Sequence, residues 1–230
     1  PENLSTLSNL VIEKGAHAGF AIDPDADRLA VVNEKGKPLG EEYTLVLAAD
    51  GYLNDTERSE KFVVNLSTSL ALDKLVTNRN CSVIRSKVGE INVVNKMNEI
   101  GSELGGEGNG GVILRECHLG RDSLVGATMV LNRMSQTNKS LSAIHNSLPQ
   151  FKIIKDKINL EGIEPETLIN NVESIFPNAD KNIEDGVKFT WDDCWVHLRK
   201  SNTEPIMRIY AEAPELKDAE ELIKMVQSCI

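Results

Sequence analysis

The spacing of hydrophobic and polar positions changes repeatedly along this chain, from the period of an amphipathic helix to short apolar runs with the length of buried strands. Up to residue 149 the two patterns alternate, and this alternation predicts a layered α/β sheet. In chain order they predict a helix at 2–14, strands at 18–22 and 29–33, a helix at 41–53, a strand at 62–66, a helix at 69–78, a strand at 82–85, a helix at 90–100, a strand at 112–114 and a helix from residue 122.

The first predicted helix carries an apolar stripe and ends at Gly15, where a left-handed cap costs little. The stripe consists of Leu4, Leu7, Leu10 and Val11. Because the chain begins directly on this helix, we expect residues 1–40 to be the tail of a further α/β domain.

The pattern changes after the polar stretch at 134–140 and the break at Pro149. The remainder of the chain contains the segment FKIIKDKINL, a helix near 165–172, two strands around the motif RKSNTEP, and a final helix. One face of the final helix should pack on a sheet, and it carries Leu216, Ala219, Leu222, Ile223 and Val226.

The predicted fold class is therefore α/β, with three segments. The tail of an α/β domain spans residues 1–40, a mixed layered α/β domain spans 41–149, and a small C-terminal α+β domain spans 150–230.

Composition limits the classes of partner. Apolar residues make up 40% of the 230 positions, which is enough for one large or two modest domains with real cores. Acidic residues outnumber basic ones by 35 to 25, and the net charge of −10 argues against binding to nucleic acid or an anionic membrane. No apolar run approaches the roughly 20 residues of a membrane span, and the beginning does not resemble a signal peptide. Four scattered cysteines without a CxxC pair indicate neither a zinc ribbon nor a disulfide framework, and favour a reducing cytoplasm.

Three polar loops interrupt these elements, and the first is DPDADR, which we call the aspartate loop (residues 23–28). Asp23, Asp25 and Asp27 are crowded at every second position, and two like charges about 4 Å apart cost on the order of 1 kcal/mol in water. A hard divalent cation turns this repulsion into binding, and Mg²⁺ prefers oxygen ligands. The loop therefore predicts a magnesium site, with a solvated acidic turn as the alternative.

An EF-hand calcium site is a further alternative, because Glu34 stands at the twelfth position counted from Asp23. Two features oppose it. Arg28 occupies the sixth position, where that loop requires glycine, and the flanking segments FAI and LAVV are typical of strands, not helices. Arg28 fits better as a phosphate partner beside the metal, since guanidinium binds phosphate through two parallel hydrogen bonds.

The second loop is GGEGNGG, the glycine loop (residues 105–111), in which Glu107 and Asn109 project from a backbone of five glycines. Such a backbone lets a ligand approach closely and still find an acceptor and an amide, which suits sugar hydroxyls. The alternative is a tight hairpin in which the glycines adopt positive φ and Glu107 faces water.

The third loop is RKSNTEP, the basic loop (residues 199–205). Arg199, Ser201 and Thr203 combine a guanidinium with two hydroxyls in a turn that also exposes backbone N–H groups, so the loop predicts a phosphate cradle. The alternative is a polar turn in which the hydroxyls bind their own backbone.

The three loops together resemble the signature loops of the α-D-phosphohexomutase family, which includes phosphoglucomutase/phosphomannomutase and phosphoglucosamine mutase. The resemblance covers nearly the whole chain. It implies that Asp23, Asp25 and Asp27 bind Mg²⁺ and that Arg28 supports the reacting phosphate.

The same resemblance implies a substrate site. Its residues would be Glu107 and Asn109 for the sugar, Arg199, Ser201, Asn202 and Thr203 for the non-transferring phosphate, and Lys87 in RSKVGE as a further substrate contact.

The family's reaction moves phosphate between positions 1 and 6 of a hexose through an enzyme phosphoserine and a bisphosphorylated sugar. The resemblance therefore implies a Mg²⁺-dependent isomerase, with a hexose phosphate as partner. No serine here lies in a loop of the family's TASHNP type, so we expect a C-terminal fragment whose partner is the N-terminal part of the same polypeptide, and which is inactive alone. The oligomeric state, including a homo-oligomer, and the choice among glucosamine, glucose and mannose phosphates stay open.

The histidines do not supply the proton carrier that some relatives have. Those relatives carry serine and histidine where this chain has Asn109 and Gly111, so that role is not transferred. We interpret the four histidines as structural or surface residues, and they are His17, His118, His145 and His197.

Two functions from other classes are also compatible with single loops. A non-catalytic calcium- or sugar-binding module would use the aspartate loop without phosphate, and a phosphatase with a DxD loop would leave the other two loops unexplained.

Overall fold

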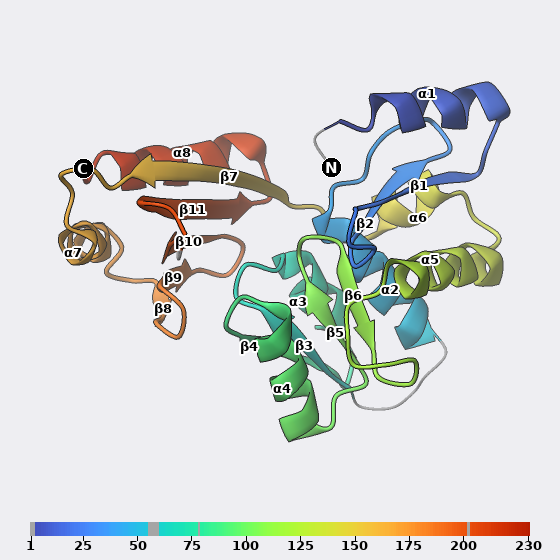
Figure 1. Cartoon of the computed structure of the whole chain (residues 1–230), viewed down its shortest axis with the longest axis horizontal. Coiled ribbons are helices and arrows are strands. Elements are labelled where there is room, and N and C mark those ends of the chain that lie inside the picture. The colour runs from blue at the N-terminus through green and yellow to red at the C-terminus, as the bar shows by residue number, and fades with distance from the viewer. Residues whose placement is uncertain (1–2, 55–59, 78, 202) are drawn as a thin grey trace. The chain divides into compact units, whose positions relative to one another are not determined.

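The computed structural model describes residues 3–54, 60–77, 79–201 and 203–230 (Figure 1). Contacts divide the chain into two compact units, Pro1–Pro149 and Gln150–Ile230. The helices are α1 (Ser5–Lys14), α2 (Glu42–Asn54), α3 (Leu70–Val76), α4 (Glu90–Ile100), α5 (Ser123–Thr137), α6 (Leu141–Ser147), α7 (Pro165–Ile175) and α8 (Leu216–Gln227). The strands are β1 (Ala18–Ile22), β2 (Leu29–Asn33), β3 (Lys61–Asn65), β4 (Ser82–Ser86), β5 (Leu104–Glu107), β6 (Gly111–Leu114), β7 (Lys152–Asn159), β8 (Asp180–Asn182), β9 (Val187–Thr190), β10 (Trp195–Lys200) and β11 (Ile206–Ala213).

A mixed four-stranded sheet in the order β4-β3-β5-β6 forms the centre of the first unit. Strand β3 is parallel to both β4 and β5, and β6 is antiparallel to β5. Parallel strands need a crossover connection, which α3 and α4 supply. The carboxyl ends of β3, β4 and β5 therefore share one edge of the sheet.

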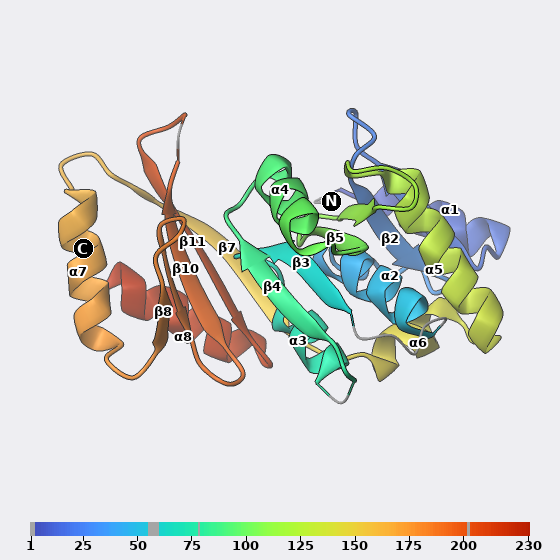
Figure 2. The ribbon, with the colours of Figure 1, turned by 90° about the horizontal axis from the view of Figure 1, so that it is seen from below.

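Helices cover both faces of this sheet (Figure 2). Helix α4 packs on one face, where Val93 and Met97 join Val63 and Ile113 in a fully buried cluster. Helices α2 and α5 pack against each other and cover the opposite face. The result is the three-layer α/β arrangement that the alternating pattern predicts.

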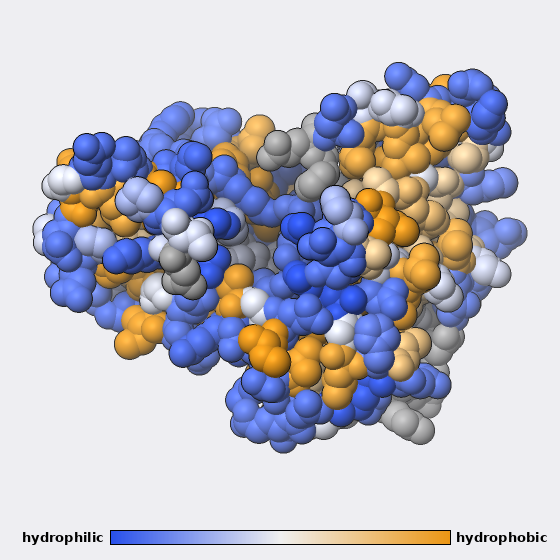
Figure 3. Space-filling view, viewed as in Figure 1, coloured by the Kyte–Doolittle hydropathy of each residue, from blue (hydrophilic) through white to orange (hydrophobic). Residues whose placement is uncertain are grey.

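The beginning of the chain forms a hairpin in which β1 and β2 pair from Ala18↔Asn33 to Ile22↔Leu29. Three side chains of its strand β2, Leu29, Val31 and Val32, are buried. Its outer side and helix α1 remain partly open, and Figure 3 shows hydrophobic side chains gathered over them. Leu10, Ile12 and Ile22 are the large exposed ones.

The second unit is an antiparallel sheet in the order β7-β11-β10-β9-β8 with α7 and α8 on one face. Leu168 and Val172 of α7, with Ile223 and Val226 of α8, bury the inner side chains of the strands. The expected α+β arrangement of this part is thus observed.

The opposite face of that sheet holds buried polar groups: Lys188, Trp195, His197 and Glu212. The Trp195 indole donates a hydrogen bond to the Glu212 carboxylate, and the Lys188 ammonium lies 4.2 Å from the centre of the Trp195 ring. His197 Nε2 lies 2.7 Å from the Asp185 carbonyl oxygen, which can only accept, so Nε2 carries the proton. Burial lowers the pKa of His197 to about 4.

Most predicted elements are observed within two or three residues of their expected ends, and Gly15 caps α1 in the left-handed conformation at φ 59°. Several expectations were wrong or incomplete. Helix α6 lies between the polar stretch and the break at Pro149, where the pattern predicts no element, and the pattern also does not predict β5, β8 or β9. Leu10 and Leu216 are 47% and 51% exposed, although the helical pattern puts both on packing faces.

No helix formed by the described residues is long and apolar enough to cross a membrane.

The buried His197 predicts a pH dependence of stability. Its folded pKa of about 4 lies below the roughly 6.5 of an unfolded histidine, so between these values the unfolded chain binds the extra proton and folding weakens as pH falls. The loss amounts to about 3 kcal/mol over that window, at 1.36 kcal/mol per pKa unit. Urea unfolding from pH 7 to pH 4.5 should show a shallower decline for His197→Gln than for the unchanged chain. His17→Gln, at an exposed position, should keep the full decline, and equal slopes for all three proteins would contradict the assignment.

Candidate functional site

The aspartate loop and the glycine loop lie against each other in the first unit. The aspartate loop connects β1 to β2, and the glycine loop contains the end of β5, its turn and the start of β6. The Leu29 N–H donates to the Gly110 carbonyl at 3.0 Å, and Ser123 donates from both its backbone and its hydroxyl to the Ala26 carbonyl. A small cavity of about 110 Å³ has Asp23, Arg28 and Asn109 in its wall.

Asp23 organises the aspartate loop. Its Oδ1 accepts hydrogen bonds from the backbone N–H groups of Asp27 (3.1 Å) and Arg28 (3.2 Å), and its Oδ2 accepts one from Arg28 Nε at 2.6 Å. Burial acts to raise the pKa of Asp23, but the hydrogen bonds and charge of Arg28 outweigh it and hold the pKa below its usual value. Asp25 is exposed, and its carboxylate makes no hydrogen bond or ion pair within the described parts of the chain.

Asp27 has the features of a cation ligand. Burial raises its pKa, the Asp23 charge adds to this, and the Arg121 guanidinium acts in the opposite direction. Its Oδ1 is buried and forms no hydrogen bond with any described residue. A buried carboxylate oxygen in this state fits a hard divalent cation. Among the residues that the structure describes, no group of three or more His, Cys, Asp or Glu side chains is already gathered around a metal position.

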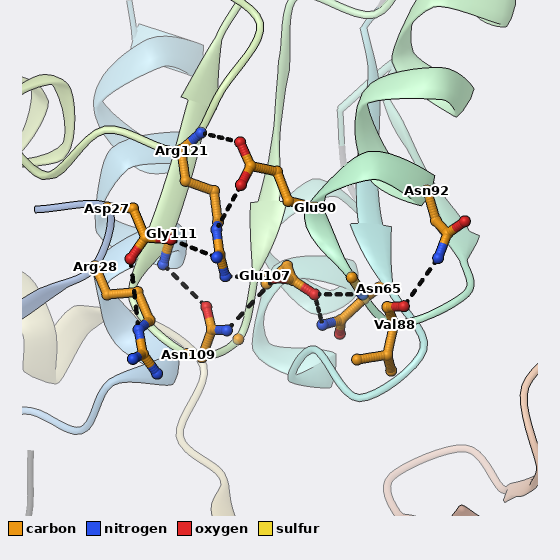
Figure 4. Close-up of polar contacts among 12 residues, drawn as sticks. Asp27, Arg28, Asn65, Val88, Glu90, Asn92, Glu107, Asn109, Gly111 and Arg121 are labelled. Atoms are coloured by element: carbon orange, nitrogen blue, oxygen red, sulfur yellow. Dashed lines mark hydrogen bonds and ion pairs between the residues drawn. The ribbon is translucent and has the colours of Figure 1, made fainter. Parts of the chain in front are cut away.

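Glu107 is buried at the end of β5, and its side chain is 3% exposed. Its Oε1 accepts hydrogen bonds from Asn65 Nδ2 (2.7 Å) and the Gly89 N–H (2.9 Å). Its Oε2 accepts from Arg121 Nη1 (2.6 Å) and, at the longer distance of 3.4 Å, from Asn109 Nδ2. The glycine loop is thus a hairpin, as the alternative interpretation held, but Glu107 points away from water into a set of donors (Figure 4).

Arg121 is a residue of this site that the sequence did not reveal. It lies between β6 and α5, and its guanidinium contacts Glu107, Asp27 and Glu90 (Figure 4). Its carboxylate partners are 14, 94 and 31 positions away in the sequence, so no local motif marks them.

Lys87 is exposed in the connection between β4 and α4. The same connection donates the Gly89 N–H to Glu107, so the backbone that carries Lys87 is attached to the glycine loop. Lys87 is therefore two positions away from a residue whose backbone contacts Glu107.

The basic loop lies in the second unit, between β10 and β11. Arg199 Nη1 is 3.8 Å from the Asp185 carboxylate, and the Ser201 and Thr203 hydroxyl oxygens are 3.4 Å apart. The Thr203 N–H also points at the Ser201 hydroxyl, at 3.4 Å. Asn202 is outside the described residues.

Arg208 is a second residue that the sequence did not reveal. It pairs directly across from Arg199 on one side and from Lys157 on the other, so three cations stand in a row across β10, β11 and β7. The Arg208 guanidinium makes no hydrogen bond or ion pair with the described residues. Like charges in opposing strand positions are destabilising, and an anion placed between them relieves the repulsion.

The histidines occupy different environments. His17 is exposed, His145 packs edge-on against the Tyr43 ring at 4.5 Å, and His197 is buried. His118 lies 3.0 Å from Asp122, and this hydrogen bond holds the pKa of Asp122 below its usual value, although burial acts in the opposite direction. None of these interactions involves Glu107 or Asp27.

The EF-hand alternative is wrong. The segments on both sides of the aspartate loop are the strands β1 and β2, not helices. The Glu34 carboxylate, the expected twelfth ligand, accepts hydrogen bonds from the N–H and hydroxyl of Ser142.

The fold and the three loops define a multidomain α/β protein with clustered carboxylates in its first unit and a row of cations in its second. Family models match nearly all of the chain. They are described as phosphoglucomutase/phosphomannomutase alpha/beta/alpha domain II (residues 1–36), alpha/beta/alpha domain III (residues 40–151) and C-terminal domain (residues 158–228). The chain belongs to the phosphoglucomutase/phosphomannomutase family of α-D-phosphohexomutases.

Relatives and solved structures agree with this assignment. The chain is 32% identical over 226 residues to a phosphoglucomutase/phosphomannomutase of Thermococcus kodakarensis, covering 97% of the chain and 49% of the relative. It is 30% identical to a phosphoglucosamine mutase of Methanocaldococcus jannaschii, covering 97% of the chain and 50% of the relative. A phosphoglucomutase/phosphomannomutase family protein from Burkholderia thailandensis has the same fold, with a TM-score of 0.84 at 23% identity over 100% of the chain and 49% of that protein. The chain spans about half the length of these relatives.

The close contact between Gly110 and Leu29 predicts that any side chain at position 110 destabilises the folded protein. Gly110 has φ 91°, and a Cβ added there would lie 2.5 Å from the Leu29 carbonyl oxygen, so backbone would have to move. We expect Gly110→Ala to cost roughly 3 kcal/mol or more of unfolding free energy, from strain and displaced backbone together. The control is Gly101→Ala. Gly101 has φ 69°, and a Cβ added there would have no atom within 4 Å, so this variant should lose only the unfolding free energy that a left-handed backbone costs alanine, about 1–2 kcal/mol. Urea unfolding measures both, and equal losses would contradict the proposed crowding.

Proposed function

We propose that the protein interconverts hexose 1-phosphates and 6-phosphates, and that this chain supplies the cation site, the sugar site and one phosphate site. The main supporting observation is the buried contact network that joins the aspartate loop to Glu107 of the glycine loop. A solvated acidic turn or a plain hairpin does not require such a network. The family's phosphoserine and bisphosphorylated intermediate are part of this proposal.

The proposed cation is Mg²⁺, held by Asp23, Asp25 and Asp27. A bound Mg²⁺ would neutralise charge on the transferring phosphoryl group. The structure of N-acetylphosphoglucosamine mutase from Aspergillus fumigatus, which has a TM-score of 0.64 at 15% identity, contains GlcNAc-6P and magnesium. The Oδ1 of Asp27 is buried without a hydrogen bond to any described residue and lies 3.6 Å from Arg28 Nε, and this state and the closeness of Asp23 support the same ligand in this chain.

Arg28 is the proposed phosphate partner at the cation. Its Nε binds Asp23, and the side chain is 44% exposed, so the remaining guanidinium hydrogens face outward beside the aspartates. This arrangement holds a positive charge next to the cation site without burying it. A transferring phosphoryl group would then be bound between two positive groups.

Glu107 is the proposed acceptor for sugar hydroxyls. Its buried carboxylate is held by donors on both oxygens, and the longest of these bonds, 3.4 Å to Asn109, is the one most readily exchanged for a hydroxyl. Asn109 would then be released to bind the sugar itself. Lys87 would contact the same ligand from the adjacent connection.

The basic loop is the proposed site of the non-transferring phosphate. Arg199, Ser201, Asn202 and Thr203 supply the sequence-predicted donors, and Arg208 and Lys157 extend the positive row. This chain is similar in sequence to relatives named phosphoglucomutase/phosphomannomutase and phosphoglucosamine mutase, so all three substrates belong in the same assay.

The division into segments 1–40, 41–149 and 150–230 remains our proposal for the domain organisation. We also propose a reducing cytoplasm as the compartment. All four cysteines are free thiols, which supports this proposal.

Arg199→Ala should weaken phosphosugar binding by about 1.5–3 kcal/mol, the value typical of a hydrogen bond to a charged group. Calorimetric titration of the chain with glucose 6-phosphate, mannose 6-phosphate and glucosamine 6-phosphate measures the change, and Mg²⁺ should strengthen binding. Lys217→Ala removes the same charge from the exposed surface of α8 and is the matched control. Equal affinities for both variants, or selective Ca²⁺ binding with indifference to phosphate, would favour the binding-module alternative.

The chain of 230 residues should show no mutase turnover on its own, because the serine that carries the phosphoryl group in this family has no counterpart in its sequence. The assay supplies Mg²⁺, a hexose 1,6-bisphosphate and each of the three hexose 1-phosphates. The complete product of the gene, assayed in parallel, should convert at least one of them. Turnover by the chain alone would refute the serine requirement, and inactivity of the complete product on all three would refute the proposed reaction.

A further inference from the structure

Arg121 binds carboxylates from three separate parts of the first unit. Its Nη2 pairs with Asp27 of the aspartate loop, its Nη1 lies 2.6 Å from Glu107 Oε2, and its Nε lies 3.4 Å from Glu90 Oε2 at the start of α4. Figure 4 shows the guanidinium between the two loops. The two contacts that reach the loops come from two different nitrogens of one rigid, planar group.

The Arg121 side chain is 16% exposed, and two of its partners, Asp27 and Glu107, are 21% and 3% exposed. Such partly dehydrated charges interact strongly, and removing one partner leaves the others uncompensated. Nε is buried without a hydrogen bond, so the directional bonds are those of Nη1 and Nη2. Nη1 therefore binds the glycine loop and Nη2 binds the aspartate loop.

The backbone of Arg121 itself is held by contacts outside both loops, although Ser123, two positions later, donates to the Ala26 carbonyl of the aspartate loop. Its N–H donates to Glu90 Oε1 at 3.0 Å, and the next residue, Asp122, accepts from Leu124 and Val125 as the N-cap of α5. The Asp122 N–H donates to the Val112 carbonyl on β6. Arg121 therefore reaches the two carboxylates from an anchored position, and its guanidinium is a side-chain link between them beside the backbone contact of Leu29 with Gly110.

We propose that Arg121 is a positioning residue that couples the aspartate loop to Glu107, so that binding a cation at one changes the state of the other. A divalent cation at Asp27 competes with Nη2 for that carboxylate, while Nη1 stays on Glu107. The interaction of the guanidinium with Asp27 then weakens, and its interaction with Glu107 strengthens. The proposal rests on the proposed function only for the identity of the ligands, a divalent cation and a sugar hydroxyl.

The first test needs neither ligand. Amide hydrogen exchange, followed by mass spectrometry, should be faster in Arg121→Gln by about tenfold or more in both residues 23–28 and 105–111, because both loops lose the same anchor. The matched control is Arg133→Gln. Arg133 is 14% exposed and binds Asp50 at 2.6 Å, but it connects α5 to α2 and touches neither loop. It should accelerate exchange in α2 and α5 and leave the loops unchanged.

The second test measures the coupling itself. Backbone NMR signals of Gly106, Gly108 and Gly110 should shift when millimolar Mg²⁺ is added to the unchanged chain, together with those of the aspartate loop. In Arg121→Gln the aspartate loop should still respond and the glycine loop should not. Arg121→Lys should behave like Arg121→Gln, because an ammonium keeps the charge but cannot donate in two fixed directions. Arg133→Gln should keep both responses, although it is also destabilised.

The outcomes separate this proposal from the proposed function. Faster exchange in one loop only, or in neither, overturns the coupling, and so does a Mg²⁺ response of the glycine loop that survives in Arg121→Gln. A response confined to the aspartate loop in the unchanged chain overturns it as well. If Mg²⁺ shifts neither loop in the unchanged chain, the proposed cation site is refuted, and the exchange measurement decides the coupling.

Discussion

The buried carboxylate of Glu107 is the constraint on which the candidate site depends. A charge at this depth is tolerated only when donors surround it, and here the three shortest bonds come from three separate segments: Asn65 at the end of β3, Gly89 before α4, and Arg121 before α5. The first two segments converge because the carboxyl ends of the parallel strands β3, β4 and β5 share one edge of the sheet, and the bond from the Asp122 N–H to the Val112 carbonyl of β6 holds the segment of Arg121 beside them. Satisfying one carboxylate therefore fixes the geometry of the surrounding connections, including the one that carries Lys87.

The two units differ in the chemistry they present. The first gathers carboxylates, from Asp23 and Asp27 to Glu90 and Glu107, and compensates them with few arginines. The second presents the cation row Arg199, Arg208 and Lys157 across three strands. Carboxylate oxygens like those of the first unit suit a hard divalent cation, and a row of cations like that of the second suits an anion such as phosphate.

Much of the fold could be predicted from the sequence, because helix and strand periods differ clearly and the three loops are compact polar clusters. Strand β5 was missed since its sequence, Leu-Gly-Gly-Glu, has low strand propensity; its glycines are required by crowding, with Met97 Sδ 2.6 Å from where a Gly105 Cβ would lie. Helix α6 had one usable signal, the N-cap Ser140, whose hydroxyl accepts from the Ala143 N–H. Arg121 and Arg208 had none, because their roles depend on partners that only folding brings close. His118 stands three residues before Arg121 in the sequence, but its ring binds only its neighbour Asp122 among the described residues.

The β1–β2 hairpin has a consequence for how this architecture can be taken apart. The family models change from one domain to the next between residues 36 and 40, yet Leu29, Val31 and Val32 are sealed inside the unit that continues to Pro149. Glu34 is also hydrogen-bonded to Ser142, far along the chain. Cleaving the chain between residues 36 and 40 would expose the hydrophobic surface that the hairpin covers, and it would separate the aspartates from Arg121. Evolutionary exchange of such modules between proteins would therefore have to carry the hairpin along with the sheet it covers.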